Sequence, residues 1–302
     1  MTVALEISGL SKTYPNGVQA LDDVSLTIRP GMFGLLGPNG AGKSTLMRTL
    51  ATLQDADAGS ARLGQVDVLR DKDAVRRMLG YLPQDFGVYP KVSAQELLDH
   101  LARLKGLDDK PTRRDVVATL LKQTNLYDVR RKALGGFSGG MRQRFGIAQA
   151  LLGAPKLIIV DEPTAGLDPE ERVRFHNLLA DIGENVIVIL STHIVSDVSD
   201  LCAEMAIINK GRVLLTGQPQ SLTARLAGRV WQKAIARSDL DVVKTQLPVI
   251  STRLVSGRTL VNVVSDRAPA DGFTLVEATL EDVYFAAITG RLNAGAAVAE
   301  VA

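Results

Sequence analysis

Short apolar runs alternate along the chain with segments of helical periodicity. Three of the runs are continuous: Met32–Leu36, Leu157–Val160 and Val186–Leu190. Continuous apolar runs of this length are typical of parallel strands that are buried on both faces of a sheet. Helices are predicted at Thr45–Leu50 and after Asp168-Pro169-Glu170-Glu171, where a cap, a proline and two acids mark a helix start. The alternation predicts an α/β fold with a parallel sheet.

Other segments alternate apolar and polar residues, which suits half-buried antiparallel strands. Val3–Ile7 and Val24–Ile28 show this pattern, and Ala61–Val68 predicts a further strand. Met205–Gly217 predicts a hairpin that turns at Asn209-Lys210-Gly211. We therefore expect an antiparallel β subdomain beside the parallel sheet.

The stretch from about Val88 to Pro155 is mostly helical in its periodicity. Apolar residues recur at helical spacing over Ser93–Leu107, with Ser93 as the cap, and again over Pro111–Leu126. A third helix is predicted from Ser138 through Leu152. These helices predict a helical subdomain over residues 88–155.

The pattern changes after about residue 220. Three strands and a helix are predicted there: Val230–Ala236, Val249–Val255, Thr259–Val264 and Leu280–Thr289. We predict one large domain over residues 1–220, a small α+β appendage over 221–290, and a disordered tail over 291–302, which is rich in alanine and glycine.

Composition narrows the function classes. The 302 residues are 46% apolar and 23% charged, with a net charge of +2, so nucleic-acid binding has no support from charge. The basic clusters at Arg113-Arg114 and Arg130-Arg131-Lys132 are interpreted as solvated surface. Cys202, the single cysteine, excludes an internal disulfide and is expected to be a buried thiol. Neither a signal peptide nor a membrane span is predicted, so a membrane role would require a partner.

The strongest chemical motif lies between a predicted strand and a predicted helix. Gly37-Pro38-Asn39-Gly40-Ala41-Gly42-Lys43-Ser44-Thr45 fits the pattern G-x-x-x-x-G-K-[ST]. Glycines let such a loop wrap round a phosphate, and the helix N-terminus adds partial positive charge. Lys43 is expected to reach the β- and γ-phosphates, and Ser44 to bind Mg²⁺. The motif predicts binding of a nucleoside triphosphate.

Three further sites carry candidate chemistry. Asp161-Glu162 follows a buried strand, so both carboxylates are expected at the edge where α/β sheets bind ligands, one serving a metal and the other a water. His193 follows another buried strand and is expected near that edge. Ser138, before Gly139-Gly140 at a helix start, offers a hydroxyl and N–H groups to an anion, or is a plain helix cap. His100 and His176 are interpreted as surface residues.

In this order, the motifs resemble those of the ATP-hydrolysing subunit of ATP-binding cassette (ABC) transporters, over roughly Val3–Ser221. Phe137–Arg144 is similar to the family signature, and its Phe137 and Met141 resemble variants of the bacterial drug and lipid exporter branch. Leu280–Phe285 with Thr289-Gly290 is similar to a C-terminal segment of that branch. The resemblance implies a P-loop NTPase with a RecA-like parallel sheet.

The resemblance also implies residue roles. Tyr14 would stack on adenine, and Ser44, Gln84 and Asp161 would lie around Mg²⁺. Glu162 would polarise the attacking water, while Gln84 and His193 read the γ-phosphate. Leu157–Pro163 is similar to the family's metal-binding strand, and Ala165-Gly166-Leu167-Asp168 to the loop after it.

The implied function is an ATPase motor. Two cassettes, identical or different, would close round two MgATP, with Ser138-Gly139-Gly140 serving the neighbouring subunit's nucleotide. Hydrolysis would drive a separate transmembrane permease from the cytoplasmic face of the membrane, for export.

Two alternatives stay open. One is an ABC ATPase of nucleic-acid repair or translation, although those resemble either heads split by long coiled coils or paired cassettes. This sequence has one cassette and no sustained heptads. The other is a P-loop enzyme of another family, such as a kinase, which would leave Ser138-Gly139-Gly140 without a purpose.

Overall fold

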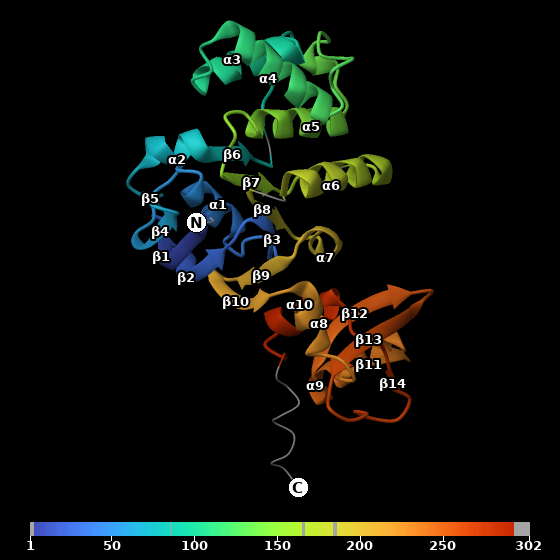
Figure 1. Cartoon of the computed structure of the whole chain (residues 1–302). Coiled ribbons are helices and arrows are strands. Elements are labelled where there is room, and N and C mark those ends of the chain that lie inside the picture. The colour runs from blue at the N-terminus through green and yellow to red at the C-terminus, as the bar shows by residue number, and fades with distance from the viewer. Residues whose placement is uncertain (1–2, 85, 165–166, 184–185, 293–302) are drawn as a thin grey trace.

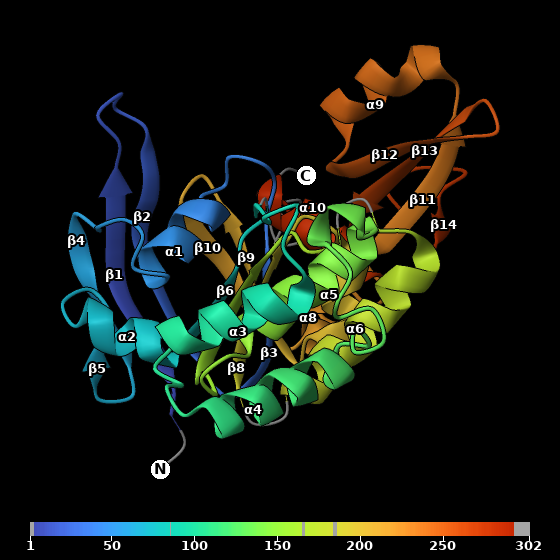
Figure 2. The same cartoon turned by 90° about the horizontal axis from the view of Figure 1, so that it is seen from above.

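The computed structural model describes residues 3–84, 86–164, 167–183 and 186–292. Two sheets occupy the middle of the molecule, a layer of helices lies on one side of them, and a C-terminal part lies on the opposite side (Figure 1). The view in Figure 2 places the N-terminal antiparallel sheet and the C-terminal part at opposite flanks of the parallel sheet. Of the tail predicted over 291–302, residues 293–302 lie outside the described residues.

A six-stranded sheet forms the centre, in the order β10-β9-β3-β8-β7-β6. Its last five strands run parallel, and β10 closes one edge antiparallel to β9. The strands are β3 (Gly31–Leu36), β6 (Leu79–Leu82), β7 (Leu157–Asp161), β8 (Ile187–Thr192), β9 (Glu204–Asn209) and β10 (Arg212–Gly217). The parallel strands and the hairpin predicted from the sequence are thereby confirmed.

Helices cover both faces of this sheet, which explains its continuous apolar runs. In β7, Leu157 and Ile159 pack toward α1, whereas Ile158 and Val160 pack toward the opposite face. The helices concerned are α1 (Lys43–Leu50) on the first face and α5 (Gly139–Ala150), α6 (Pro169–Gly183) and α7 (Val195–Leu201) on the second. Cys202, at the end of α7, is buried as expected, and burial followed by the charge of Asp197 raises the pKa of its thiol to about 12.

A second, antiparallel sheet covers α1 from the far side, in the order β2-β1-β4-β5. Its strands are β1 (Leu5–Thr13), β2 (Gln19–Ile28), β4 (Ala58–Leu63) and β5 (Val66–Asp67). The single strand predicted over Ala61–Val68 is therefore wrong. The chain reverses at Gly64, whose φ of 59° lies in the region that glycine tolerates best, so that Leu63 pairs with Val66.

The helical layer has its own apolar cluster, which contains the fully buried Phe145 of α5. Besides α5 it contains α3 (Ala94–Leu104), α4 (Lys110–Gln123) and a short 3₁₀ turn at Leu134–Gly136, and α2 (Lys72–Met78) precedes it beside β6. Ser93 caps α3 through a capping box, as the sequence predicts. Arg113 is not solvated surface, contrary to expectation. Its guanidinium bonds Asp99 and the carbonyls of Leu107 and Asp108, and the residue is 6% exposed.

The C-terminal part begins with α8 (Pro219–Ala224) and contains a sheet in the order β12-β13-β11-β14. Its elements are β11 (Val230–Ile235), a 3₁₀ turn at Arg237–Asp239, α9 (Leu240–Gln246), β12 (Val249–Val255), β13 (Arg258–Val264), β14 (Thr274–Leu275) and α10 (Leu280–Ile288). The predicted strands and the last helix are confirmed, whereas α8, α9 and β14 were not predicted.

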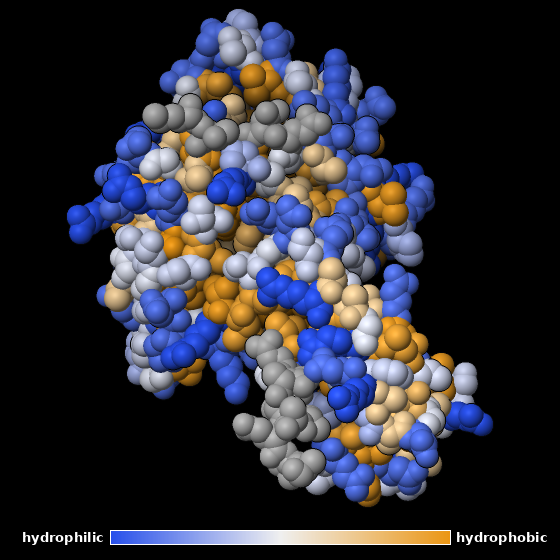
Figure 3. Space-filling model, turned by 60° about the horizontal axis from the view of Figure 1, so that its bottom comes forward, coloured by the Kyte–Doolittle hydropathy of each residue, from blue (hydrophilic) through white to orange (hydrophobic). Residues whose placement is uncertain are grey.

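One apolar cluster joins the C-terminal part to the central sheet. Leu222 of α8 and Val283 of α10 share it with Val198 of α7 and Ile207 of β9. On the face shown in Figure 3, apolar side chains gather between the larger N-terminal part and the C-terminal part. The domain limits at residues 220 and 290 stay predictions.

Candidate active site

The carboxyl ends of four parallel strands bring the predicted residues together. The loop of Gly37–Lys43 follows β3, Gln84 follows β6, Glu162 follows β7 and His193 follows β8. Because these strands are parallel neighbours, all four segments lie at one sheet edge. They line a pocket of about 340 Å³ together with the β1–β2 turn. The pocket is lined by Tyr14, Val18, Ala20, Pro38, Asn39, Gly40, Ala41, Gly42, Lys43, Ser44, Thr45, Gln84, Glu162 and His193.

The glycine-rich loop packs closely against β2 at Gly42. Its φ is 106°, and a Cβ on this residue would lie 2.3 Å from the carbonyl oxygen of Ala20. Gly42 also occupies the N-cap position of α1, and within the described residues no side chain caps the helix there. The first N–H groups of α1 are therefore not occupied by a capping side chain, which suits an anion at this helix end.

Lys43 and Glu162 form the buried centre of the site. The two residues are 5% and 7% exposed, and Lys43 Nζ lies 3.5 Å from Glu162 Oε1. The same ammonium donates to the carbonyl oxygens of Gly37, at 2.6 Å, and Pro38, at 3.3 Å. This ammonium is able to exchange the two carbonyls for phosphate oxygens, which are stronger acceptors because they carry negative charge.

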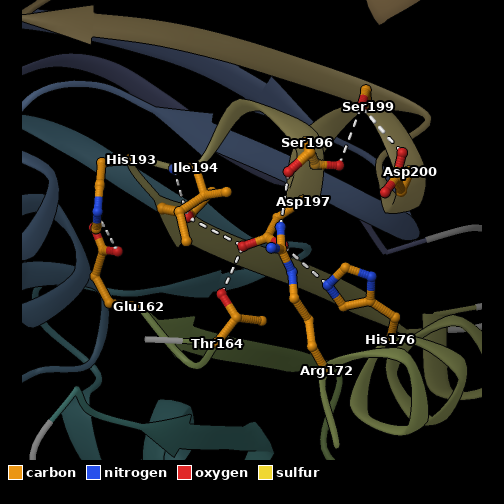
Figure 4. Close-up of polar contacts among 11 residues, drawn as sticks. Glu162, Thr164, Arg172, His176, His193, Ile194, Ser196, Asp197, Ser199 and Asp200 are labelled. Carbon is orange, nitrogen blue, oxygen red and sulfur yellow. Dashed lines mark hydrogen bonds and ion pairs between the residues drawn. The ribbon is translucent and has the colours of Figure 1, made fainter. Parts of the chain in front are cut away.

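His193 contacts the other oxygen of Glu162. Its Nδ1 lies 2.6 Å from Glu162 Oε2, and half of the histidine side chain is exposed (Figure 4). Glu162 adopts a φ of 49°, and its N–H donates to the carbonyl of Ser191 at 2.8 Å. A positive φ at a non-glycine residue costs about 1–3 kcal/mol, and such strain concentrates at functional sites. The chain therefore holds Glu162 in a strained turn that aims its carboxylate between Lys43 and His193.

Asp161 is placed differently from Glu162. It is 4% exposed, does not line the pocket, and its Oδ1 has no hydrogen-bond partner among the described residues. A buried carboxylate oxygen without a donor fits a divalent cation, which prefers oxygen ligands. Ser44 and Gln84, the other predicted Mg²⁺ residues, line the pocket.

Asp161, Ser44 and Gln84 supply only one carboxylate between them. In the described part of the chain, no three His, Cys, Asp or Glu residues gather into a metal site of their own. The oxygen donors therefore fit Mg²⁺ that arrives with a phosphate rather than a resident ion.

Tyr14 lies on the wall of the pocket, next to two residues that the sequence did not predict. Its hydroxyl lies 3.1 Å from Thr45 Oγ1 and donates to Gln54 Oε1 at 3.2 Å. Val18 and Ala20 lie on the same side of the pocket, and Val18 is 54% exposed. The sequence signal that could have found them is a valine four residues after Tyr14, in the same turn segment. Together these residues offer an apolar surface to a nucleobase.

Ser138-Gly139-Gly140 is not brought to the pocket. The Ser138 hydroxyl accepts from Met141 N at 3.2 Å, so it acts as the N-cap of α5 in this chain. A Cβ on Gly140 would lie 2.3 Å from Glu171 Oε2, whereas nothing lies within 4 Å of one on Gly139. Part of the loop Ala165–Asp168 lies outside the described residues.

The prediction for His176 as a surface residue is wrong. Its side chain is 12% exposed, and Nε2 lies 3.0 Å from Oδ1 of the fully buried Asp197. His100 is exposed, as expected. Asp197 was not singled out from the sequence, because its partners come from segments far apart in the chain.

Comparison with known proteins agrees with this geometry. The family model described as ABC transporter matches residues 21–165. The daunorubicin/doxorubicin resistance ATP-binding protein DrrA of Streptomyces peucetius is 38% identical over 231 residues, 76% of this chain and 69% of that protein. The daunorubicin resistance ATP-binding protein DrrA3 of Streptomyces coeruleorubidus is 32% identical over 271 residues, 88% of this chain and 85% of that protein. This chain belongs to the ABC transporter family.

Some relatives are longer. The chain spans 47% of the probable multidrug ABC transporter ATP-binding protein YbhF of Escherichia coli, to which it is 32% identical over 279 residues. The chain thus spans about half the length of the longer curated relatives that it matches.

Solved ABC structures show the same fold. A dimeric post-hydrolysis state of an ATP-binding cassette bound to ADP and phosphate is 26% identical, with a TM-score of 0.64 over 71% of this chain and 98% of that one. An ATP-binding subunit of an ABC transporter is 27% identical, with a TM-score of 0.65 over 73% and 92%. The P-loop NTPase fold predicted from the sequence is confirmed. Among the described residues, no helix of this ABC protein combines the length and apolarity that crossing a membrane requires.

Proposed function

We propose that this chain is the ATP-hydrolysing motor subunit of an ABC transporter. The observation that carries the proposal is the convergence of Lys43, Glu162 and His193 behind a glycine-rich loop in one pocket. At one sheet edge, the buried ammonium of Lys43 supplies a ligand for phosphate. The buried carboxylate of Glu162, beside the half-exposed imidazole of His193, supplies a general base. Phosphoryl transfer requires mainly such positioning and charge stabilisation.

Each residue of the site has a distinct role toward the substrate. The loop amides and Lys43 bind the phosphates, with the ammonium leaving the carbonyls of Gly37 and Pro38. Glu162 polarises the attacking water, and His193 fixes the Glu162 carboxylate through Oε2. Asp161, Ser44 and Gln84 would hold Mg²⁺, which would neutralise charge on the phosphates. Tyr14 and Val18 contact the adenine base of ATP.

The nucleotide site is completed by a second cassette, identical or related. Ser138-Gly139-Gly140 lies outside this chain's pocket, although its helix start suits an anion. The dimeric neighbour bound to ADP and phosphate supports this arrangement. Ser138 would then exchange its capping bond to Met141 for a phosphate oxygen of the partner's nucleotide.

A separate groove supports docking of a transmembrane permease. It has a volume of about 600 Å³ and contains Leu53 and Leu104, which are 61% and 72% exposed. Exposed leucines that face one groove are typical of a protein contact. Leu79 and Tyr81 of β6 also line it, and the same strand leads to Gln84 in the nucleotide pocket. β6 and the segment that directly follows it therefore line both sites, which suits transmission between ATP and the permease.

The proposal places the chain on the cytoplasmic face of a membrane complex. The relatives named for drug resistance favour export. An ABC ATPase acting on nucleic acid is the competing function. Pull-down from detergent-solubilised membranes distinguishes them, because the motor is expected to recover a polytopic protein, and recovery of ribosomes or nucleic acid alone would favour the competitor.

Lys43→Ala tests the ATPase assignment. The variant is expected to lose MgATP hydrolysis and to weaken MgATP binding, because no other ammonium lines the described pocket. Circular dichroism is expected to show an unchanged fold. Unaltered turnover by this variant would remove the assignment.

Leu104→Asp tests the docking groove. It is expected to keep the ATPase activity of the isolated chain and to lose permease capture. Leu254→Asp is the matched control, since Leu254 is 65% exposed and lies in the C-terminal hairpin. Equal capture by both variants would rule out the groove.

A further inference from the structure

Asp197 is a fully buried carboxylate that ties three segments together (Figure 4). It lies on α7 and receives hydrogen bonds from α6, from the segment after β7 and from the end of β8. A buried charge is costly unless donors surround it. Five donor groups from four residues of other elements surround this single side chain: two from Arg172 and one each from His176, Thr164 and Thr192.

The two oxygens of Asp197 have separate partners. Oδ1 faces α6, where Arg172 donates from Nε at 2.9 Å and from Nη2, and His176 Nε2 lies at 3.0 Å. Because a carboxylate only accepts, His176 carries its hydrogen on Nε2 in this contact. Oδ2 faces the sheet edge, where it accepts from Thr164 Oγ1 at 2.6 Å and Thr192 Oγ1 at 3.4 Å.

The partners of Oδ2 lie beside the two residues that form the site. Thr164 comes two residues after Glu162, and Thr192 comes directly before His193. Both threonines are buried, at 4% and 0% exposure, so neither hydroxyl has ready access to solvent. Thr192 Oγ1 also accepts from Ile194 N at 3.0 Å, which fixes the turn on the far side of His193.

We propose that Asp197 is a positioning residue for ATP hydrolysis. Its Oδ2 holds the Glu162 segment and the His193 segment in one register, so that the 2.6 Å contact between these two side chains is kept. Through Oδ1 the same carboxylate anchors both segments to α6. This inference rests on the proposed ATPase activity, but it concerns residues that do not touch the nucleotide pocket.

The proposal predicts that loss of one Oδ2 bond slows chemistry and spares binding. A small misplacement of reacting groups is able to cost tenfold to a hundredfold in rate. Thr164→Val replaces the hydroxyl with a methyl group of similar size, and it leaves Arg172 and His176 on Oδ1. We expect kcat for MgATP hydrolysis by the full chain to fall at least about tenfold. The Kd of a fluorescent ATP analogue is expected to change by less than about twofold, because the loop at Lys43 is not involved.

Two further variants separate positioning from stability. Thr164→Ser keeps the hydroxyl and is expected to restore kcat. His176→Asn removes an Oδ1 partner on the side away from Glu162, so it is expected to lower the Tm while kcat stays within about twofold. Thr192→Val, which removes the other Oδ2 donor, is expected to behave as Thr164→Val does.

The outcomes distinguish this inference from the proposed function. If the wild-type chain hydrolyses MgATP and Thr164→Val shows wild-type kcat, Asp197 is only a structural residue. The same conclusion follows if Thr164→Val and His176→Asn lose kcat in proportion to their Tm. If the wild-type chain itself lacks hydrolysis, the proposed function fails first.

Discussion

Alanine at Gly42 and at Gly40 provides a paired test of the phosphate loop. Both glycines have positive φ, 106° and 77°, so alanine at either position incurs backbone strain of about 1–2 kcal/mol. Only Gly42 is crowded, because its Cβ would lie 2.3 Å from the backbone oxygen of Ala20, whereas nothing lies within 4 Å at Gly40. Forcing β2 away adds about 1–3 kcal/mol at Gly42. In both variants alanine offsets about 0.4–1 kcal/mol of this loss in stability, because it restricts the conformations of the unfolded chain.

The net loss in the free energy of unfolding is thus about 1–5 kcal/mol for Gly42→Ala, with a midpoint of about 3 kcal/mol, and about 0–2 kcal/mol for Gly40→Ala, with a midpoint of about 0.8 kcal/mol. Thermal unfolding without nucleotide, followed by far-UV circular dichroism, is expected to show a Tm lower by about 5–10 °C for the first and by less than about 3 °C for the second. Equal shifts for the two variants would show that the loop does not pack against β2 as described.

Three further predictions follow from single side chains. Arg113→Ala is expected to reduce the free energy of unfolding by about 2 kcal/mol, because it removes the buried guanidinium that bonds Asp99 and the carbonyls of Leu107 and Asp108, whereas exposed Arg114→Ala changes it by less than about 0.5 kcal/mol in urea titrations. Since its pKa is raised to about 12, the Cys202 thiol is almost entirely protonated at pH 8, so a thiolate-selective disulfide reagent is expected to label it at least about a thousandfold more slowly in the folded chain than in urea. Tyr14→Phe is expected to keep ATP affinity in a fluorescence titration and Tyr14→Ala to lose about tenfold, because in the proposed stacking the ring rather than its hydroxyl would contact the adenine base; the reverse order would contradict the stacking role.

Local pattern and motif were sufficient for most of the fold. The buried strands follow from continuous apolar runs because each strand alternates its side chains between two covered faces, as Leu157 and Ile158 do. The loop at Gly37–Lys43 and the residues after β7 and β8 converge because parallel neighbouring strands end at one edge. Resemblance to a family was needed for Tyr14 and Gln84, since their residue types and local sequence carry little signal.

The errors concern contacts between distant segments. His176 has a helical surface pattern, and only its approach to Asp197, 21 residues later, shows that it is largely buried. Arg113 likewise belongs to a basic pair in the sequence. Its guanidinium donates to the carbonyls of Leu107 and Asp108, which lie in the loop before its own helix. The reversal at Gly64 was readable in principle, because glycine interrupts the apolar pattern there.

The most direct test of the account is whether Glu162 cleaves ATP in a site that a second cassette completes. Glu162→Gln keeps the size and hydrogen bonding of the side chain and removes its charge. With MgATP it is expected to bind nucleotide without cleaving it, and size-exclusion chromatography is expected to show a dimer that is absent without nucleotide.

Adding Ser138→Arg to Glu162→Gln places a bulky cation where the partner's phosphate is expected, and this double variant is predicted to stay monomeric in MgATP at matched salt. Two results would contradict the account. Undiminished hydrolysis by Glu162→Gln would show that Glu162 is not the catalytic carboxylate. If the double variant dimerised as well as Glu162→Gln, Ser138 would be only the cap of α5, as it is in the single chain.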